Sequence, residues 1–223
     1  MRNVNVGMAR TIGGLGAILL LSCAAGASLM NDPYGMDGGV STQWQGRTHF
    51  QSSPAYVSLD IEFSVYAPGQ FDASFGLGSD PSGGSDYVYA YQIHNNLQPK
   101  NSRDYIKIFT VGFSGGNEVP MGIGSLAGPD RNPDAVMFSP VPPAVAQSAV
   151  WQFNTGNVLA WNEISDVLYY ASPFGPEMDN ASVTGRYGVF NQQQLPSPTP
   201  EPATIVFLVA GMIAACRRRK MAI

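Results

Sequence analysis

Few residues of this chain could take part in catalysis. The sequence holds only two histidines, His49 and His94. A histidine that acts as a general base needs a carboxylate and a nucleophile beside it, and the neighbours of His94, Asn95 and Asn96, supply neither. We therefore interpret both histidines as surface residues in or near turns, and we predict that the chain is not an enzyme.

Metal ligands are equally sparse. The two cysteines, Cys23 and Cys216, lie in the end segments, so they cannot form a zinc site or a disulfide in the body of the chain. Asp130, Asn132 and Asp134 alternate as in the start of a calcium-binding loop. The glycine and the acidic residue that such a loop needs at its sixth and twelfth positions are missing, and clusters of this composition are common in turns. We predict no metal and no cofactor.

Aromatic residues could have either of two roles. Gathered on one surface, their rings would stack on sugars, and the chain would be a carbohydrate-binding module that associates with exopolysaccharide. A domain without disulfides also needs large apolar side chains in its core, and aromatic residues supply them. We favour core packing for most of the set, which comprises Trp44, Tyr87, Tyr89, Tyr91, Trp151, Trp161, Tyr169 and Tyr170.

The distribution of charge argues against a nucleic-acid partner. Residues 28–200 carry 15 acidic and 6 basic side chains, a net charge of −9, while the other basic residues lie at the two ends. Nucleic-acid binding needs a clustered basic surface. Charged residues make up only 13% of the chain, and glycine and proline are abundant, which is typical of short strands joined by tight turns.

Alternating apolar and polar residues predict strands along the body of the chain. The clearest is 57–65, whose odd residues should face a core while Ser58, Asp60, Glu62 and Ser64 face water. Residues 71–77 alternate again. Residues 87–94 and 105–113 suggest a hairpin with a long loop, and a change of phase within 105–113 indicates a β-bulge or burial on both sides.

Weaker strands follow at 135–139, 149–153, 166–171 and 181–190. About eight short strands with regular turns predict an all-β protein with one β-sandwich, of Ig-like or jelly-roll type, over residues 43–190. Residues 28–42 suggest a loose lead-in to this domain.

The N-terminal segment has the order of a secretion signal. Arg2 and Arg10 precede an apolar run at 12–21, and small residues follow, with 25–27 fitting the small-x-small rule for signal peptidase. We predict a signal peptide over residues 1–27. The stretch that ends at Cys23 also resembles a lipobox, so acylation of Cys23 stays open as an alternative.

The C-terminal segment has four parts in a fixed order. A Pro-rich stretch at 191–199 precedes Pro200, Glu201, Pro202, Ala203 and Thr204, and an apolar run continues to residue 216. The final part is a group of basic residues, Arg217, Arg218, Arg219 and Lys220. This order resembles the PEP-CTERM sorting signal, and the resemblance covers about 25 residues. Parts of the body, at 86–96 and 165–176, are more loosely similar to exported proteins of that kind.

The resemblance implies a route rather than an activity. It implies that an exosortase in the membrane cuts near residues 200–202, so that the body is released or transferred to the cell surface. Members are associated with bacteria that make exopolysaccharide and biofilm. The resemblance therefore implies a non-enzymatic protein of the cell surface or biofilm matrix.

The dimensions of the tail favour a temporary anchor. Residues 203–216 carry no charge, but a helix of that length reaches only about 21 Å, against about 30 Å for the hydrocarbon core of a bilayer. The basic residues 217–220 would hold the end on the cytoplasmic side. We predict a Pro-rich spacer at 191–199 and a sorting tail at 200–223, with a permanent tail anchor as the alternative.

Overall fold

The computed structural model describes residues 28–39, 43–51, 58–95, 105–113, 121–126, 131–140, 147–154, 158–185 and 188–199. The predicted signal peptide, 1–27, and the predicted sorting tail, 200–223, lie outside these residues. No helix within the described ranges is long and apolar enough to cross a membrane.

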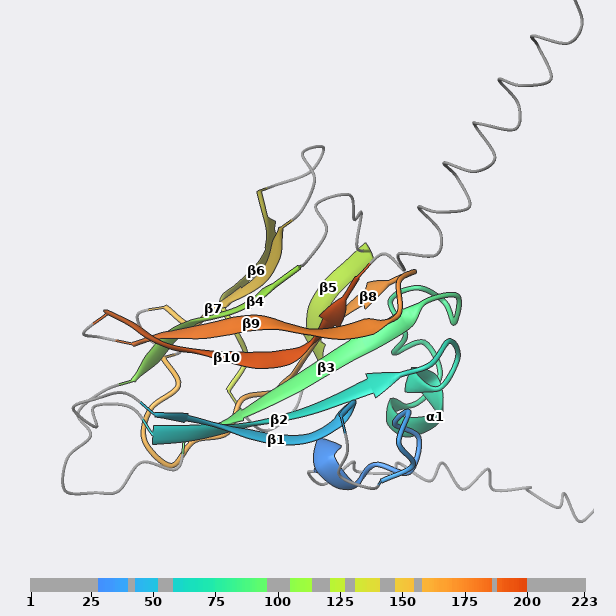
Figure 1. Cartoon of the computed structure of the whole chain (residues 1–223), viewed down its shortest axis with the longest axis horizontal. Coiled ribbons are helices and arrows are strands. Elements are labelled where there is room, and N and C mark those ends of the chain that lie inside the picture. Colours follow the sequence, from blue (N-terminus) through green and yellow to red (C-terminus); the bar gives the residue numbers. More distant parts are fainter. Residues whose placement is uncertain are drawn as a thin grey trace, which may run out of the picture.

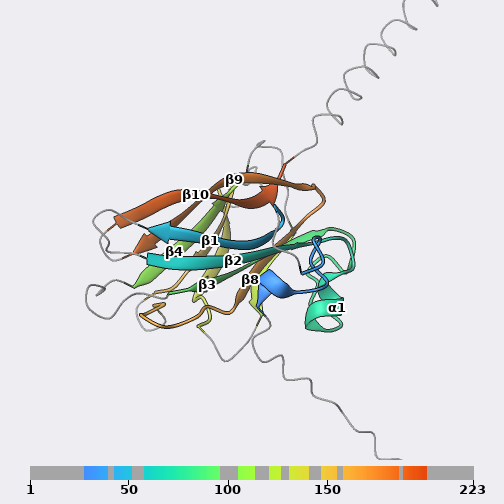
Figure 2. The same ribbon diagram turned by 60° about the horizontal axis from the view of Figure 1, so that its bottom comes forward.

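The described residues form an all-β body of two antiparallel five-stranded sheets with very little helix (Figure 1). Sheet A has the strand order β1 (Gln45–Gln51), β2 (Ser58–Tyr66), β3 (Tyr87–His94), β8 (Val167–Ser172) and β5 (Met121–Leu126). Sheet B has the order β10 (Gly188–Pro198), β9 (Pro176–Gly185), β4 (Ile106–Gly112), β7 (Ser148–Gln152) and β6 (Ala135–Ser139). The two layers face each other, and β1 runs beside β10 (Figure 2). The predicted all-β sandwich is confirmed at this level.

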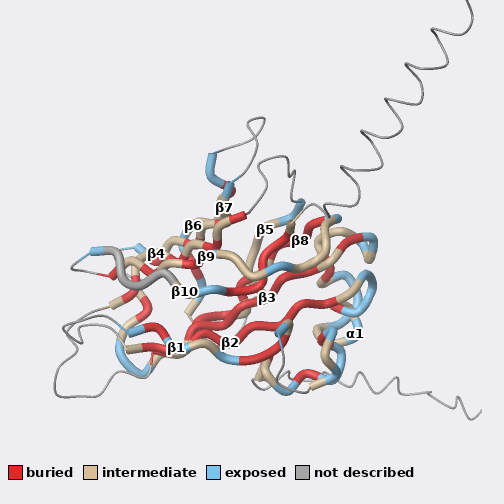
Figure 3. Tube along the Cα trace, viewed as in Figure 1, coloured by how far each residue is buried: buried red, intermediate tan, exposed pale blue. Residues whose placement is uncertain are grey.

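The main core lies between the two sheets (Figure 3). The predicted inward residues of β2, namely Leu59, Ile61, Phe63 and Val65, are all buried there. Because side chains of a strand alternate between its two faces, this result fixes the facing of the whole strand. Glu62 and Ser64 lie on the opposite face as predicted, but both are buried, so the expectation that they face water is wrong.

Aromatic rings from both sheets meet in the centre of the core. Tyr91 of β3 packs edge-on against Phe109 of β4, with 5.6 Å between ring centroids, and Phe109 stacks on Trp151 of β7 at 5.4 Å. The Tyr91 hydroxyl donates a hydrogen bond to the Pro196 carbonyl of β10. Large rings thus fill the space between the sheets and connect them without a disulfide.

A second apolar cluster covers one end of the outer face of sheet A. It centres on Tyr66, which contacts the ring of Phe71 at 5.2 Å and that of Phe75 at 5.9 Å. Both phenylalanines belong to the short helix α1, Phe71–Phe75, so the strand predicted over 71–77 is wrong. Residues four apart share one side of a helix, and the helical conformation brings both rings onto Tyr66.

The segment before β1 is packed rather than loose. It contains the short 3-10 helix η1, Leu29–Asn31, whose Leu29 is buried against sheet A. Gln45 of β1 donates hydrogen bonds of 2.8 Å to the carbonyls of Leu29 and Asp32. The Tyr66 hydroxyl donates to the Asp32 carboxylate at 2.7 Å. The expectation of a loose lead-in is therefore wrong for residues 28–39.

The connections between strands differ from the sequence-based prediction. β3 and β4 belong to different sheets, so they do not form the predicted hairpin. The predicted strand 181–190 is divided between β9 and β10, which pair as a hairpin. The predicted change of phase in β4 is confirmed as a shift of register between Ile106 and Ile108.

The prediction for the Pro-rich stretch near the C-terminal end is wrong. Residues 191–198, predicted as a spacer outside the domain, belong to β10, and 193–198 pair with β9. Leu195 is buried in the main core. β10 is an edge strand of sheet B, where proline is tolerated because one side of the strand needs no backbone donor. The folded body therefore continues to Pro198.

Candidate functional site

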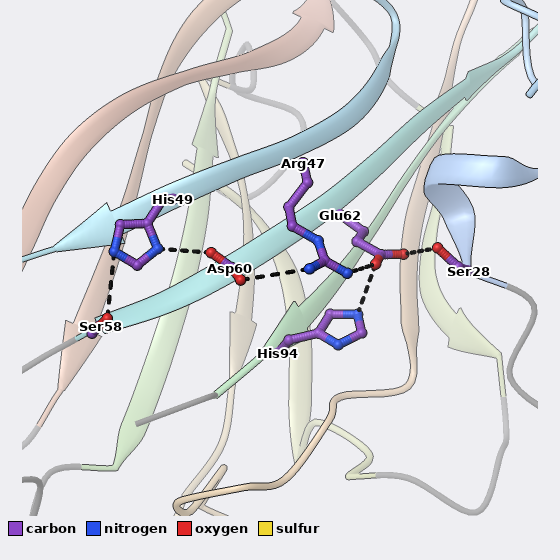
Figure 4. A network of polar contacts seen from close by, with 7 residues as sticks. All are labelled: Ser28, Arg47, His49, Ser58, Asp60, Glu62 and His94. Atoms are coloured by element: carbon purple, nitrogen blue, oxygen red, sulfur yellow. Dashed lines mark hydrogen bonds and ion pairs between the residues drawn. The ribbon is translucent and has the colours of Figure 1, made fainter. Parts of the chain in front are cut away.

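Polar side chains from three neighbouring strands gather on the outer face of sheet A (Figure 4). Seven residues, here called the polar row, make up this network: Ser28, Arg47, His49, Ser58, Asp60, Glu62 and His94. The register of the sheet explains why they meet. His49 of β1 lies opposite Asp60 of β2, Arg47 lies opposite Glu62, and His94 of β3 lies opposite Asp60 on the other side. Directly opposed residues place their side chains on the same face.

At one end of the polar row, a serine, a histidine and an aspartate follow one another. The His49 Nδ1 lies 2.7 Å from the Asp60 Oδ1, and the Ser58 Oγ lies 3.4 Å from the His49 Nε2. This is the order of groups in a hydrolytic triad. However, 3.4 Å is long for a hydrogen bond, and 51% of the His49 side chain is exposed. We interpret the contacts as polar pairing between strands and assign them no catalytic role.

At the other end, Glu62 is a buried acid with several partners. Only 1% of its side chain is exposed. The guanidinium of Arg47 donates to its Oε1 and also lies 3.7 Å from the Asp60 carboxylate. The His94 Nε2 lies 3.6 Å from the same Oε1, and the Ser28 hydroxyl donates to Oε2 at 2.6 Å.

These contacts set the acidity of Glu62. Burial raises the pKa of the Glu62 carboxyl, but hydrogen bonds from Ser28 and Arg47, together with the charges of His94 and Arg47, outweigh it. The pKa of Glu62 therefore lies below its ordinary value. The carboxylate is held in its charged form in a place that water barely reaches.

The two histidines differ from each other. His49 is a surface residue, as the sequence predicts, although it sits within β1 and is paired with Asp60. His94 ends β3, and only 15% of its side chain is exposed. The interpretation of His94 as a surface residue in a turn is wrong. The carboxylate that the sequence neighbours of His94 could not supply comes from Glu62 on the adjacent strand.

Other candidate residues lie apart from the polar row. Asn132 accepts a hydrogen bond of 2.6 Å from the Ser125 hydroxyl, and Asp134 accepts one from the Asn154 backbone amide; Asp130 lies outside the described residues. In the described part of the chain, no three His, Cys, Asp or Glu side chains lie close enough together to hold a metal ion.

Seven of the eight aromatic residues of the set lie in the core or pack against it. Tyr89, Tyr91, Trp151 and Tyr170 are fully buried there, as the sequence analysis favours. Trp161 is an exception, because 47% of its surface is exposed. An aromatic platform for sugars cannot be built from the four buried rings.

The predicted sorting residues, from Pro200 to Thr204 and from Arg217 to Lys220, lie outside the described residues. Three comparisons with known proteins add no family or fold relative: no protein-family model, no curated protein and no solved structure matches this chain. Function must therefore be inferred from the sequence pattern at the ends of the chain and from the chemistry of the folded body.

Proposed function

We propose that this chain is an exported, non-enzymatic protein of the bacterial cell surface or biofilm matrix, and that an exosortase cuts its C-terminal tail. One observation carries the proposal: Pro200, Glu201 and Pro202 precede an uncharged run at 203–216, which ends in four basic residues at 217–220. This order resembles the PEP-CTERM signal. A signal peptidase would remove residues 1–27, and the membrane would hold the tail only until cutting.

The composition of the body supports export. The body has no cysteine between Cys23 and Cys216, so it folds without dependence on the redox state of its compartment. Its core of aromatic and aliphatic side chains takes the place of disulfides. Its net charge of −9 over residues 28–200 favours solubility outside the cell.

The length of chain between the body and the tail gives the proposal a spatial consequence. β10 ends at Pro198, and the Thr199 amide donates a hydrogen bond of 3.1 Å to the Gly175 carbonyl. Four residue steps lead from Thr199 to Ala203, and they span at most about 14 Å. The body would therefore lie close to the membrane surface while the exosortase acts on residues 200–202.

Replacement of one residue in the cutting motif tests the proposal. Glu201→Ala should leave membrane insertion unchanged and block cutting, so that the full-length chain accumulates in the membrane. Mass spectrometry of protein from the native cell surface should recover the body without peptides from 205–216. Recovery of those peptides from surface-exposed protein would contradict the proposal and indicate a simple tail anchor. Glu177→Ala, at an exposed position of β9, serves as the control that should still be cut.

The carbohydrate-binding alternative has less support, because four of the eight aromatic residues it would use are fully buried and three more are partly buried against the core. Trp161 is the exposed ring that such a site would use. A glycan array separates the two functions, since the structural role expects no saturable binding of sugars. Binding that is lost in Trp161→Ala would favour the alternative.

A further inference from the structure

Glu62 contacts Ser28, the first residue after the predicted signal peptide. The predicted cleavage falls between Ala27 and Ser28, and the Ser28 hydroxyl donates to the Glu62 Oε2 at 2.6 Å (Figure 4). Cleavage at this bond converts the neutral amide nitrogen of Ser28 into a charged ammonium. We propose that Glu62 is the binding site for this new N-terminal ammonium. The proposal rests on the export step of the proposed function.

The position of Ser28 brings its nitrogen near the carboxylate. The Ser28 carbonyl accepts a hydrogen bond of 3.1 Å from the Asn31 amide, and its hydroxyl is fixed on Glu62. Within one serine, the nitrogen and the hydroxyl oxygen lie about 3 to 4 Å apart, as standard bond lengths require. The nitrogen of Ser28 therefore lies within about 6 Å of Oε2. That range includes the separation of about 4 Å or less that an ion pair needs.

The charges of the polar row favour an added cation. Arg47 is shared between Asp60 and Glu62. Arg47 thus supplies one positive charge against two carboxylates. The guanidinium and His94 approach Oε1 of Glu62, whereas the Ser28 hydroxyl engages Oε2. A new ammonium would approach Glu62 from the Oε2 side, in a place where ion pairing is strong because water is largely excluded.

The consequence is a coupling between processing and stability. In the precursor, the nitrogen of Ser28 is an uncharged amide and cannot form the ion pair. In the mature chain, the ammonium ties residues 28–39 to the outer face of sheet A. Removal of the signal peptide would thus stabilise the folded body.

A shift of the N-terminus by one residue tests this site. Two chains that extend to residue 223 are compared in detergent, one beginning at Ser28 and the other at Ala27, so that the ammonium moves by about 3.8 Å. The chain beginning at Ser28 should have the higher Tm, by about 3 °C. The difference should vanish when both chains carry Glu62→Gln and persist with Glu177→Gln, the control. Equal Tm values, or a difference that survives Glu62→Gln, would overturn the proposal.

A second measurement covers the case in which Glu62→Gln does not fold. The rate of acylation of the α-amino group is followed by mass spectrometry in the native chains and in urea. The amine of Ser28 should react at least tenfold more slowly in the native chain, and that of Ala27 should show little protection. Equal protection of the two amines would also overturn the proposal.

Failure of the export step has a separate signature. N-terminal sequencing of the protein from its native cell should show a chain that begins at Ser28. A chain that begins at acylated Cys23 would overturn the natural occurrence of the ammonium. The Tm comparison would still decide whether Glu62 can bind it.

Discussion

The two ends of the outer face of β2 share one sequence pattern but differ in burial. Ser58 and Asp60 lie at the open end, where the polar row reaches solvent. Glu62, Ser64 and Tyr66 continue the same alternation and are buried. The difference comes from what covers the strand, because η1 and α1 pack on one end and leave the other open. Alternation thus decides which side a residue faces, while a distant segment decides whether that side meets water.

Close packing at the covered end shows how specific this cover is. A Cβ atom added to Gly35 would lie 2.4 Å from the Ser64 Oγ, so no larger residue fits there without movement. The Met36 amide donates to the Val65 carbonyl at 2.8 Å. The segment 28–39 therefore docks on β2 through its backbone as well as through Leu29.

The largest loss of stability is expected from a change on the inner face of β2, which faces the main core, rather than at either end of the outer face. Ile61→Asp would place an unpaired charge in the main core and should abolish cooperative unfolding. Circular dichroism against temperature measures this loss. Asp60→Asn, one residue away on the outer face, should keep the transition with a loss below about 1 kcal/mol. An unchanged transition in Ile61→Asp would show that the facing of β2 is wrong.

The second largest loss of stability is expected from a change in α1, which covers one end of the outer face. Phe71→Ala removes the buried one of the two α1 rings that pack on Tyr66 and should lower the free energy of unfolding by about 3 to 5 kcal/mol. Urea denaturation measures the change. Leu77→Ala is the control, because Leu77 is 99% exposed and its loss should change stability by less than about 0.5 kcal/mol. Similar effects of the two changes would mean that α1 does not cover the strand.

The third largest loss of stability is expected from replacement of Glu62, and this loss should depend on pH. Glu62→Gln removes the charge that Arg47 and Ser28 bind, and should cost about 2 kcal/mol at pH 7. Because folding lowers the pKa of Glu62, its stabilisation is present above the pKa of the unfolded chain and is lost as pH falls through the lower folded value. The Tm difference between wild type and Glu62→Gln should therefore shrink from pH 6 towards pH 3.

Glu163→Gln provides the matched control for that change. The Arg131 guanidinium donates to Glu163 at 2.6 Å, but both side chains are partly exposed. Solvent screens such a pair, so its loss should cost less than about 1 kcal/mol. An equal cost for the two variants would show that the cover over Glu62 has no energetic effect.

The smallest effect is expected at the open end. His49→Ala should cost less than about 1 kcal/mol, because the His49 side chain is half exposed. It should also leave the rate of hydrolysis of an activated ester at the level of Ser58→Ala and of wild type. Turnover by the wild type that disappears in both variants would reveal a working triad and contradict the non-enzymatic proposal.

Sequence patterns located the strands better than their partners. The predicted bounds of β3, 87–94, and of β6, 135–139, agree with the structure, and those of β2 are within one residue, because each pattern reflects local alternation. Phe71 and Phe75 misled the same reasoning, since a spacing of four fits one turn of helix and also two steps of a strand. β1 and β5 were not assigned as strands, and β5 has an irregular register with β8.

The polar row could be predicted only in part. The alternation of 57–65 correctly placed Ser58, Asp60 and Glu62 on one face. It could not show that Glu62 is buried, because the cover comes from a segment about thirty residues earlier in the chain. Nor could it bring His94 to Glu62, because their approach depends on the register between β2 and β3. Such registers depend on pairing across the sheet, which no local pattern in one strand specifies.

The edge position of β10 has a mechanical consequence. A force applied at Thr199 pulls on the end of this strand, whose last pairs join Pro198 to Pro176 and Pro196 to Met178. Proline contributes no backbone donor, so this end has fewer hydrogen bonds to resist the force. The bonds that remain would break one after another from Pro198 inwards, and the strand would peel away rather than slide. A body pulled from its C-terminal end would therefore give way first at the end of β10, and cutting beyond Thr199 would remove that force.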